Sequence, residues 1–389
     1  MIRSIISLVI LLLFMSAKTI IMAQTGDSIV PQHDFRFSGQ LSGWGSITPD
    51  TPDIETKGWL GGRYIPQVNY TYTLNKDRLI DFEGSASLFG EMGITSAPKV
   101  TATGNVKPYR LWARYATQGS EMRLGLQKIN FGSAQLFRPL MWFDKMDPRD
   151  PLQMTDGVWG GLYRRYLLNN SNIWLWLLAG NKDPKGWELF GTGGNLSPEA
   201  GGRAQLPIPS GEAALSYHFR QTNIVRPNLP NQQANEQRIG FDIRADVTVG
   251  LWLETSLTHY DRNIGLVTNQ QMITLGSDYT FGLGNGLGVT AEHLFYGVGS
   301  KLCSYEETLN FSGLSLSYPF TLFDDVTTLL FYDWKNQQLY SFINWQKQFN
   351  RISFYLMGFW NPKTYQIPGQ GSFSRFTGKG LQMMVVWNH

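Results

Sequence analysis

One segment of the sequence, residues 131–156, gathers side chains that could bind and select solutes. It reads FGSAQLFRPLMWFDKMDPRDPLQMTD, with the run DPRDP at 147–151. Arginine holds a carboxylate through two parallel N–H groups, and charges lining a water-filled passage discriminate between solutes. We therefore expect this segment to sort solutes and to make or break no bonds. Its charged residues are Arg138, Asp144, Lys145, Asp147, Arg149, Asp150 and Asp156.

A second group of cations precedes this segment, on stretches whose residues alternate between polar and apolar. Arg110 and Arg114 stand two positions either side of Trp112, and Arg123 follows on the next stretch. Alternate residues of a strand share one face, so we predict that these arginines line one wall. We hypothesise that acids of 131–156 face this arginine ladder across a constriction and create a transverse field. Two alternatives remain: the charges only pair and hydrate the interior, or the DPRDP run only shapes turns. The predicted constriction residues are Arg110, Arg114, Arg123, Arg138, Asp144, Asp147, Arg149 and Asp150.

Aromatic side chains offer a second kind of solute contact. Trp112, Trp142 and Trp252 are candidates for a slide on which sugar rings stack. The alternative is that they pack in the interior or belong to the aromatic girdles of a membrane protein.

Composition bounds the class of protein that positions these groups. The 389 residues are 42% hydrophobic, 16% charged and 14% aromatic, with 33 basic and 30 acidic residues and one cysteine. This excludes disorder, a disulfide scaffold and a cysteine-built metal site, and it gives no reason to expect a nucleic-acid partner or a cofactor. The length suggests two or three domains unless one large sheet closes on itself. Two classes of protein remain: a large soluble all-β protein and a protein embedded in a membrane.

The first 23 residues have the pattern of a cleaved secretory signal peptide. Arg3 precedes an apolar stretch at 5–14, and Ala23 offers a cleavage point. Cleavage after Ala17 and a retained anchor helix are the alternatives. Beyond residue 24 no run of about 18 apolar residues occurs, so a spanning structure has to be a closed barrel. We therefore expect a signal peptide at 1–23 and a single barrel domain at 24–389.

Period-two alternation dominates the rest of the chain. Ile239, Phe241 and Ile243 alternate with polar residues such as Asp242 and Arg244. Segments of about ten residues with this pattern indicate an all-β, transmembrane, antiparallel up-and-down β-barrel of about eighteen strands, with sixteen as the alternative. The predicted strands are 35–47, 59–74, 79–92, 107–117, 120–130, 157–167, 172–180, 200–208, 211–220, 237–249, 250–260, 271–281, 286–296, 311–318, 326–334, 339–348, 351–360 and 378–387.

Four long segments interrupt these strands. Polar insertions at 182–199, 221–236 and 361–379 are predicted to be outer loops. Segment 131–156 differs, because Leu140, Trp142 and their apolar neighbours do not suit a solvated loop. We predict that it folds into the barrel as a constriction loop.

Two motifs resemble those of a known group of barrels. Gly125 and Gln127 form a Gly-x-Gln pattern that precedes Phe131-Gly132 and the run at 147–151. This pattern resembles outer-membrane porins of the alginate-export and related substrate-specific channel families; the motif spans about 30 residues and the strand pattern most of the mature chain. The alternating residues 381–387 resemble the C-terminal signal read by the barrel-assembly machinery. They end on Trp387, but Asn388 and His389 follow where the usual signal ends on an aromatic residue.

The resemblance implies a porin of the Gram-negative outer membrane, embedded in lipid, through which small hydrophilic solutes, anions or sugars among them, diffuse passively. A surface-assembly or polysaccharide-export or attachment barrel is the alternative. A barrel enzyme such as a phospholipase is the lesser one, since it needs a serine activated by a histidine. No histidine begins the pattern His-x-Ser-Asn-Gly, and no metal-ligand spacing occurs, so we predict no enzyme, no catalytic residue and no metal. The five histidines are His33, His218, His259, His293 and His389.

Overall fold

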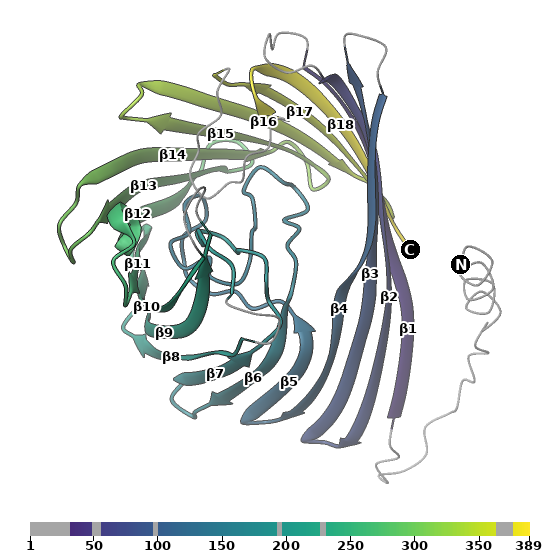
Figure 1. Cartoon of the computed structure of the whole chain (residues 1–389). Coiled ribbons are helices and arrows are strands. Elements are labelled where there is room, and N and C mark those ends of the chain that lie inside the picture. Colours follow the sequence, from purple (N-terminus) through teal and green to yellow (C-terminus); the bar gives the residue numbers. More distant parts are fainter. Residues whose placement is uncertain (1–31, 49–55, 96–99, 193–196, 226–230, 363–375) are drawn as a thin grey trace. The chain divides into compact units, whose positions relative to one another are not determined.

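The computed structural model describes residues 32–48, 56–95, 100–192, 197–225, 231–362 and 376–389, which form one sheet of eighteen strands (Figure 1). The predicted signal peptide lies outside the described residues. Among the described residues, no helix has the length and apolar character needed to cross a membrane. The strands are β1 (Gln32–Ile47), β2 (Thr56–Asn75), β3 (Arg78–Thr95), β4 (Val100–Thr117), β5 (Ser120–Gln127), β6 (Val158–Tyr166), β7 (Asn172–Leu178), β8 (Glu199–Ile208), β9 (Gly211–Ile224), β10 (Gln232–Asp246), β11 (Gly250–Tyr260), β12 (Asn269–Phe281), β13 (Leu287–Gly299), β14 (Glu307–Pro319), β15 (Asp324–Asp333), β16 (Gln338–Gln348), β17 (Ile352–Trp360) and β18 (Lys379–Asn388).

The sheet closes on itself. Each strand pairs antiparallel with its sequence neighbours, and β1 also pairs with β18, where Trp44 lies opposite Met384. Closure leaves no unpaired edge, which is the condition for a sheet to span lipid. The predicted up-and-down barrel of eighteen strands is therefore confirmed, and the alternative of sixteen is wrong.

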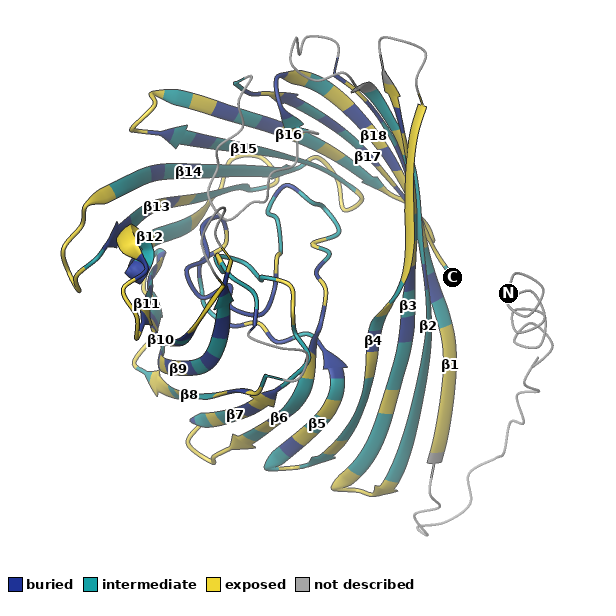
Figure 2. Cartoon of the chain, viewed as in Figure 1, coloured by how far each residue is buried: buried dark blue, intermediate teal, exposed yellow. Residues whose placement is uncertain are grey.

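The two faces of the sheet differ in chemistry, and the difference follows the alternation of the sequence. On β10, Ile239 and Phe241 are 49% and 36% exposed, whereas Arg238 and Asp242, which flank them, are 4% and 1% exposed. Figure 2 shows this alternation of buried and exposed residues along the strands. An outer face rich in exposed large apolar side chains is stable only against lipid, so the strands span a membrane and the polar face lines the interior.

The two ends of the barrel carry connections of different lengths. One end has short turns, such as residues 76–77, 118–119 and 209–210, and the other has long connections, such as 128–157, 179–198 and 361–378. One predicted outer loop, 221–236, is mostly strand, because β9 continues to Ile224 and β10 begins at Gln232. The inward residues of these strand ends, such as Thr222 and Glu236, are polar. The sequence of the strand ends therefore resembled that of a loop.

Candidate functional site: the loop inside the barrel

The connection between β5 and β6, residues 128–157, lies within the ring of strands (Figure 1). The Glu254 carboxylate on the inner face of β11 accepts hydrogen bonds from the backbone N–H groups of Ala134 and Leu140, at 2.9 and 2.7 Å. Gly132 has a φ of +96°, and a Cβ there would lie 2.3 Å from Glu254 Oε2. A glycine is therefore needed for the loop to approach this carboxylate so closely.

A second wall carboxylate fixes the next three residues of the loop. Glu292 on β13 accepts hydrogen bonds from the backbone N–H groups of Gln135, Leu136 and Phe137, at 2.6, 3.0 and 2.6 Å. Trp252 Nε1 also donates to Glu292, at 3.1 Å. Hydrogen bonds to charged groups are the strong ones in proteins. Two buried carboxylates thus fix the start of the loop to the wall opposite the strand from which it leaves.

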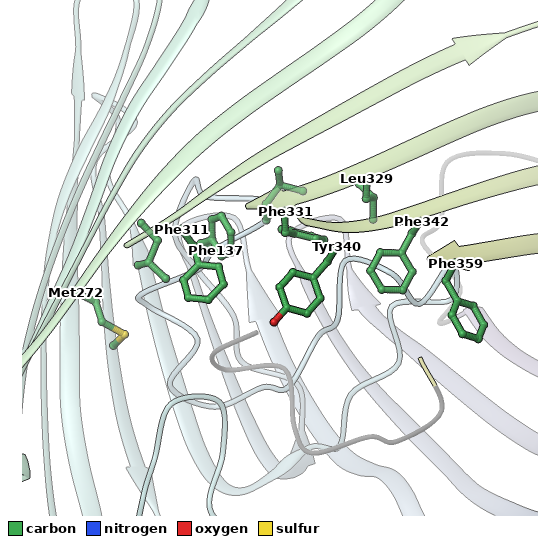
Figure 3. Close-up of a cluster of buried hydrophobic side chains, with 10 residues drawn as sticks. Phe137, Met272, Phe311, Leu329, Phe331, Tyr340, Phe342 and Phe359 are labelled. Atoms are coloured by element: carbon green, nitrogen blue, oxygen red, sulfur yellow. The ribbon is translucent and has the colours of Figure 1, made fainter. Parts of the chain in front are cut away.

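Apolar packing holds the same part of the loop. Phe137 is 1% exposed, and its ring lies 5.4 Å from that of Phe331 and 6.2 Å from that of Phe311. Gly313 makes room for it, because a Cβ there would lie 2.9 Å from the Phe137 ring. Figure 3 shows this aromatic cluster on the inner face of β12–β17, formed by Leu136, Phe137, Met272, Leu294, Phe311, Leu329, Phe331, Tyr340, Phe342 and Phe359.

A second apolar cluster forms where the loop packs on β6 and β7. Trp142 is 2% exposed, donates from Nε1 to Ser256 Oγ at 3.0 Å, and packs over Gly240, as Leu140 does. Trp252 is 3% exposed. Neither tryptophan can therefore act as the predicted sugar slide, since a stacking surface has to be accessible. Trp112 remains half-buried on the wall.

The charges of the loop mostly pair with each other. Arg138 donates to both oxygens of Asp144, at 2.8 and 3.2 Å, and both side chains are buried. Arg149 Nε donates to Asp147 Oδ1 at 2.7 Å. Asp144 and Asp147 therefore pair with arginines of the loop itself and not with the predicted ladder, whereas Asp156 pairs with Lys107 of β4 at 2.6 Å.

Asp150 shapes the tip of the loop. Its carboxylate accepts hydrogen bonds from the backbone N–H groups of Leu152 and Met154, both at 3.0 Å. Burial raises the pKa of Asp150 above its usual range, although these two backbone bonds oppose the shift. The DPRDP run does shape turns here, as one of the alternatives from the sequence proposed.

The predicted ladder lies on the inner wall but meets partners of its own. Arg114 makes a bidentate pair with Asp81, at 2.9 and 2.7 Å, and also contacts Glu121. Arg110 donates to the Thr155 carbonyl at 2.9 Å, which ties the end of the loop to β4. Arg123 has its guanidinium 4.5 Å from the centre of the Trp112 ring. The three arginines thus lie on one wall, and among the described residues none of them forms an ion pair with Asp144, Asp147 or Asp150.

A second segment that folds inward was not predicted. Residues 182–199 were expected to be an outer loop, but Glu188 lies 4% exposed against the inner wall, where it pairs with Arg220 and Arg238, at 2.8 and 2.7 Å. Glu236 completes this buried network. Trp187 Nε1 donates to the Arg138 carbonyl at 2.8 Å, so this segment also supports the first loop. The sequence carries no signal of this segment, because the inward arginines of β9 and β10 (Arg220, Arg238 and Arg244) are already matched by inward acids of the same strands (Glu212, Glu236, Asp242 and Asp246).

A cavity of about 320 Å³ remains between the tip of the loop and the wall formed by β1, β2, β17 and β18. Polar and apolar groups share its lining, and the loop supplies about half of them. It is lined by Ser42, Trp44, Arg63, Lys145, Met146, Asp147, Arg149, Asp150, Pro151, Leu152, Met154, Gly186, Met357, Phe376, Gln382 and Met384.

One serine–histidine contact bears on the enzyme alternative. His293 Nδ1 lies 3.0 Å from Ser312 Oγ on the outer face, and Trp334 Nε1 donates to the same oxygen at 2.9 Å. The pair borders an apolar groove of about 890 Å³. A hydrolytic triad needs a third group that orients the histidine. Within the described ranges, no carboxylate forms an ion pair with His293.

Comparison with known proteins relates this geometry to solved structures. No protein-family model matches the chain, and no curated protein matches it. The solved structures of OccAB4 and OccAB1 of Acinetobacter baumannii are each 9% identical to it, with a TM-score of 0.57; the alignments cover 92% of this chain and 98% and 95% of those chains. Wzi of Escherichia coli, described as an outer-membrane protein involved in group 1 capsule assembly and a carbohydrate-binding β-barrel, is 11% identical with a TM-score of 0.51, over 90% of this chain and 83% of that chain. These likenesses confirm the outer-membrane β-barrel fold.

Proposed function

We propose that this outer-membrane β-barrel is a channel through which small hydrophilic solutes diffuse passively, and that the loop 131–156 narrows it. The observation that carries the proposal is the attachment of the loop by Glu254 and Glu292. A loop fixed to one wall reduces the passage without closing the opposite side, where Arg63 and Lys145 border the cavity.

The inner wall supports the same proposal. Strands β1–β4 present polar residues such as Gln67, Asn69 and Ser85 to the interior, opposite the apolar cluster that holds the loop. Water-filled passages need such a lining, since polar groups take the place of part of a solute's hydration shell.

Liposome swelling tests this function. Purified protein is inserted into liposomes, which are then diluted into isotonic solutions of sugars and amino acids of increasing size. The proposal expects swelling that slows as solute size rises. Absence of swelling by the smallest solute, with the barrel correctly folded in the liposomes, would contradict it.

A surface-assembly or polysaccharide barrel is the second candidate. One observation favours it: the loop and the aromatic cluster of β12–β17 fill one side of the interior with a packed core, which suits a holding surface as well as a passage. Folded protein that causes no swelling but retains polysaccharide from the surface of the cell would support this candidate.

Export and insertion complete the proposal. Residues 1–23 direct the chain out of the cytoplasm and are removed, and the barrel-assembly machinery inserts residues 24–389 through strand β18. The outward residues of β18 alternate and are exposed, among them Met383 at 60% and Trp387 at 41%. A lipid-hydrolysis assay on the inserted protein addresses the enzyme alternative, for which we expect no activity.

A further inference from the structure

A groove of about 890 Å³ lies on the outer face of the barrel, which the proposed function does not use. It follows a row of paired outward residues that crosses the strands, from Ile243 on β10 through His293 on β13 to Leu339 on β16. In the next row, Ser277 and Ala291 lie opposite each other, and their small side chains leave the surface hollow between larger leucines. Lipid faces this surface, so the occupant of the groove comes from the membrane.

The groove descends obliquely through the membrane. Leu339 is one residue from the start of β16, at the end with long connections, whereas Ile243 is three residues from the end of β10, at the end with short turns. Neighbouring strands lie about 4.8 Å apart, so the groove from β10 to β16 is about 29 Å long. The hydrocarbon core is about 30 Å thick, and the chains of one leaflet reach about half of that. One acyl chain therefore fits along the groove.

Three polar side chains interrupt the apolar lining of the groove. Trp334 follows the last residue of β15 and donates from Nε1 to Ser312 Oγ at 2.9 Å. His293 Nδ1 lies 3.0 Å from the same oxygen, so this ring nitrogen and the serine hydroxyl satisfy each other. Among the described residues, no protein group forms a hydrogen bond with the other ring nitrogen, Nε2 of His293. A polar atom left without a partner is unfavourable against hydrocarbon, so Nε2 requires a partner from the lipid.

The depth of His293 indicates what that partner is. His293 is the middle residue of β13, six positions from either end, whereas Trp334 lies at the strand end, where aromatic girdles meet lipid head groups. An oxygen at the depth of His293 therefore belongs to an acyl chain and not to a head group. A hydroxyl both donates and accepts, so it satisfies Nε2 in either tautomer of the neutral ring, whereas a carbonyl satisfies only one.

We propose that this groove binds a lipid with a hydroxylated acyl chain, which lies along the groove with its hydroxyl on His293 Nε2. Neither lysine nor arginine is among the described residues that line the groove, so the groove holds the neutral chain and the head group stays outside it. The site goes beyond the proposed channel and does not depend on it, because His293, Ser312 and Ala291 face away from the interior.

Native mass spectrometry of the full-length protein in detergent tests the site. The probes are β-hydroxymyristate and myristate, which differ only in the hydroxyl group. The variants are His293→Leu, which removes the ring nitrogens, His293→Gln, which keeps an amide N–H, and Ala291→Phe, which fills the hollow. Ala204→Phe is the matched control, because Ala204 is also exposed on the outer face but lies on β8, away from the groove. Heat-dependent mobility on gels verifies that each barrel is folded.

We expect the wild type to bind β-hydroxymyristate about tenfold more tightly than myristate, which is the contribution of one hydrogen bond. His293→Leu should remove this preference, and His293→Gln should keep part of it. Ala291→Phe should weaken the binding of both probes about tenfold or more, while Ala204→Phe should change neither by more than about twofold. Equal binding of the two probes by the wild type, a preference that survives in His293→Leu, or unchanged binding in Ala291→Phe would overturn the site.

Discussion

The Glu292 carboxylate of β13 accepts a hydrogen bond from the backbone N–H of Phe137 at 2.6 Å, across the barrel from β5, the strand after which the loop begins. The two residues are 155 positions apart in the chain. Apolar side chains alone would bury the loop without fixing where it lies. The hydrogen bond between these two residues fixes its position. The loop is therefore held at one place on the inner wall.

Replacement of Glu292 by glutamine should loosen the loop. The amide keeps one oxygen acceptor but loses the charge that makes hydrogen bonds to the three N–H groups strong. With about 1–2 kcal/mol lost, the amides of residues 135–137 should exchange with solvent about tenfold faster or more. Hydrogen exchange measured by mass spectrometry provides the test. Glu307→Gln, at an exposed ion pair at the start of β14, is the control and should change nothing. Equal exchange in both variants would show that Glu292 does not hold the loop.

A methyl group at Gly240 should displace the loop from the wall. The Cβ of Gly240→Ala would lie 2.3 Å from Leu140 Cδ2 and 3.0 Å from the Trp142 ring, so the loop has to shift. Such overpacking costs about 1–3 kcal/mol. We expect faster cleavage within residues 131–156 by a protease added to the folded protein. Gly90→Ala, where nothing lies within 4 Å, is the matched control. Identical cleavage of both variants would contradict the packing described for Leu140.

Removal of Arg220 should destabilise the whole barrel. Glu236 and Glu188, which are 0% and 4% exposed at their side chains, would lose a buried partner. Uncompensated buried charge costs about 3–5 kcal/mol. The temperature at which the barrel loses its folded gel mobility should therefore fall clearly in Arg220→Ala and hardly at all in Arg36→Ala. A network that served only to hydrate the interior would give the same small shift in both.

Cys303 reports which end of the barrel faces the exterior. It is exposed in the connection between β13 and β14, at the end with long connections. Long loops of such barrels lie outside the cell and short turns lie in the periplasm. A maleimide that cannot cross membranes should label Cys303 in intact cells, and Cys303→Ser should abolish the signal. Labelling only after the outer membrane is broken would reverse the orientation.

The strands could be predicted from the sequence because each depends on local alternation. The faces on which Phe241 and Asp242 lie follow from the neighbouring residues in the sequence alone. The inward course of the loop was also predictable, because exposing large apolar side chains such as Trp142 and Leu140 to water is unfavourable. The partners of its charges were not: Asp144 pairs with Arg138 rather than with the ladder, because the turn of the loop brings those two together.

Contacts between distant segments explain the other differences. Glu188 sits among ordinary loop residues, and only the fold places it beside Arg220 and Arg238. Glu254 stands on an alternating strand like many inward acids. Its role depends on backbone N–H groups of residues 134 and 140. Every residue except proline has such a group, so the sequence gives no sign of these hydrogen bonds.

Single-channel conductance in planar bilayers tests the central claim most directly, when wild-type protein is compared with the double variant Glu254→Ala/Glu292→Ala. The account predicts discrete conductance steps for the wild type and larger, noisier steps for the variant, because the released loop no longer limits the passage. Folded wild-type protein that shows no conductance, or a variant whose steps equal those of the wild type, would contradict it.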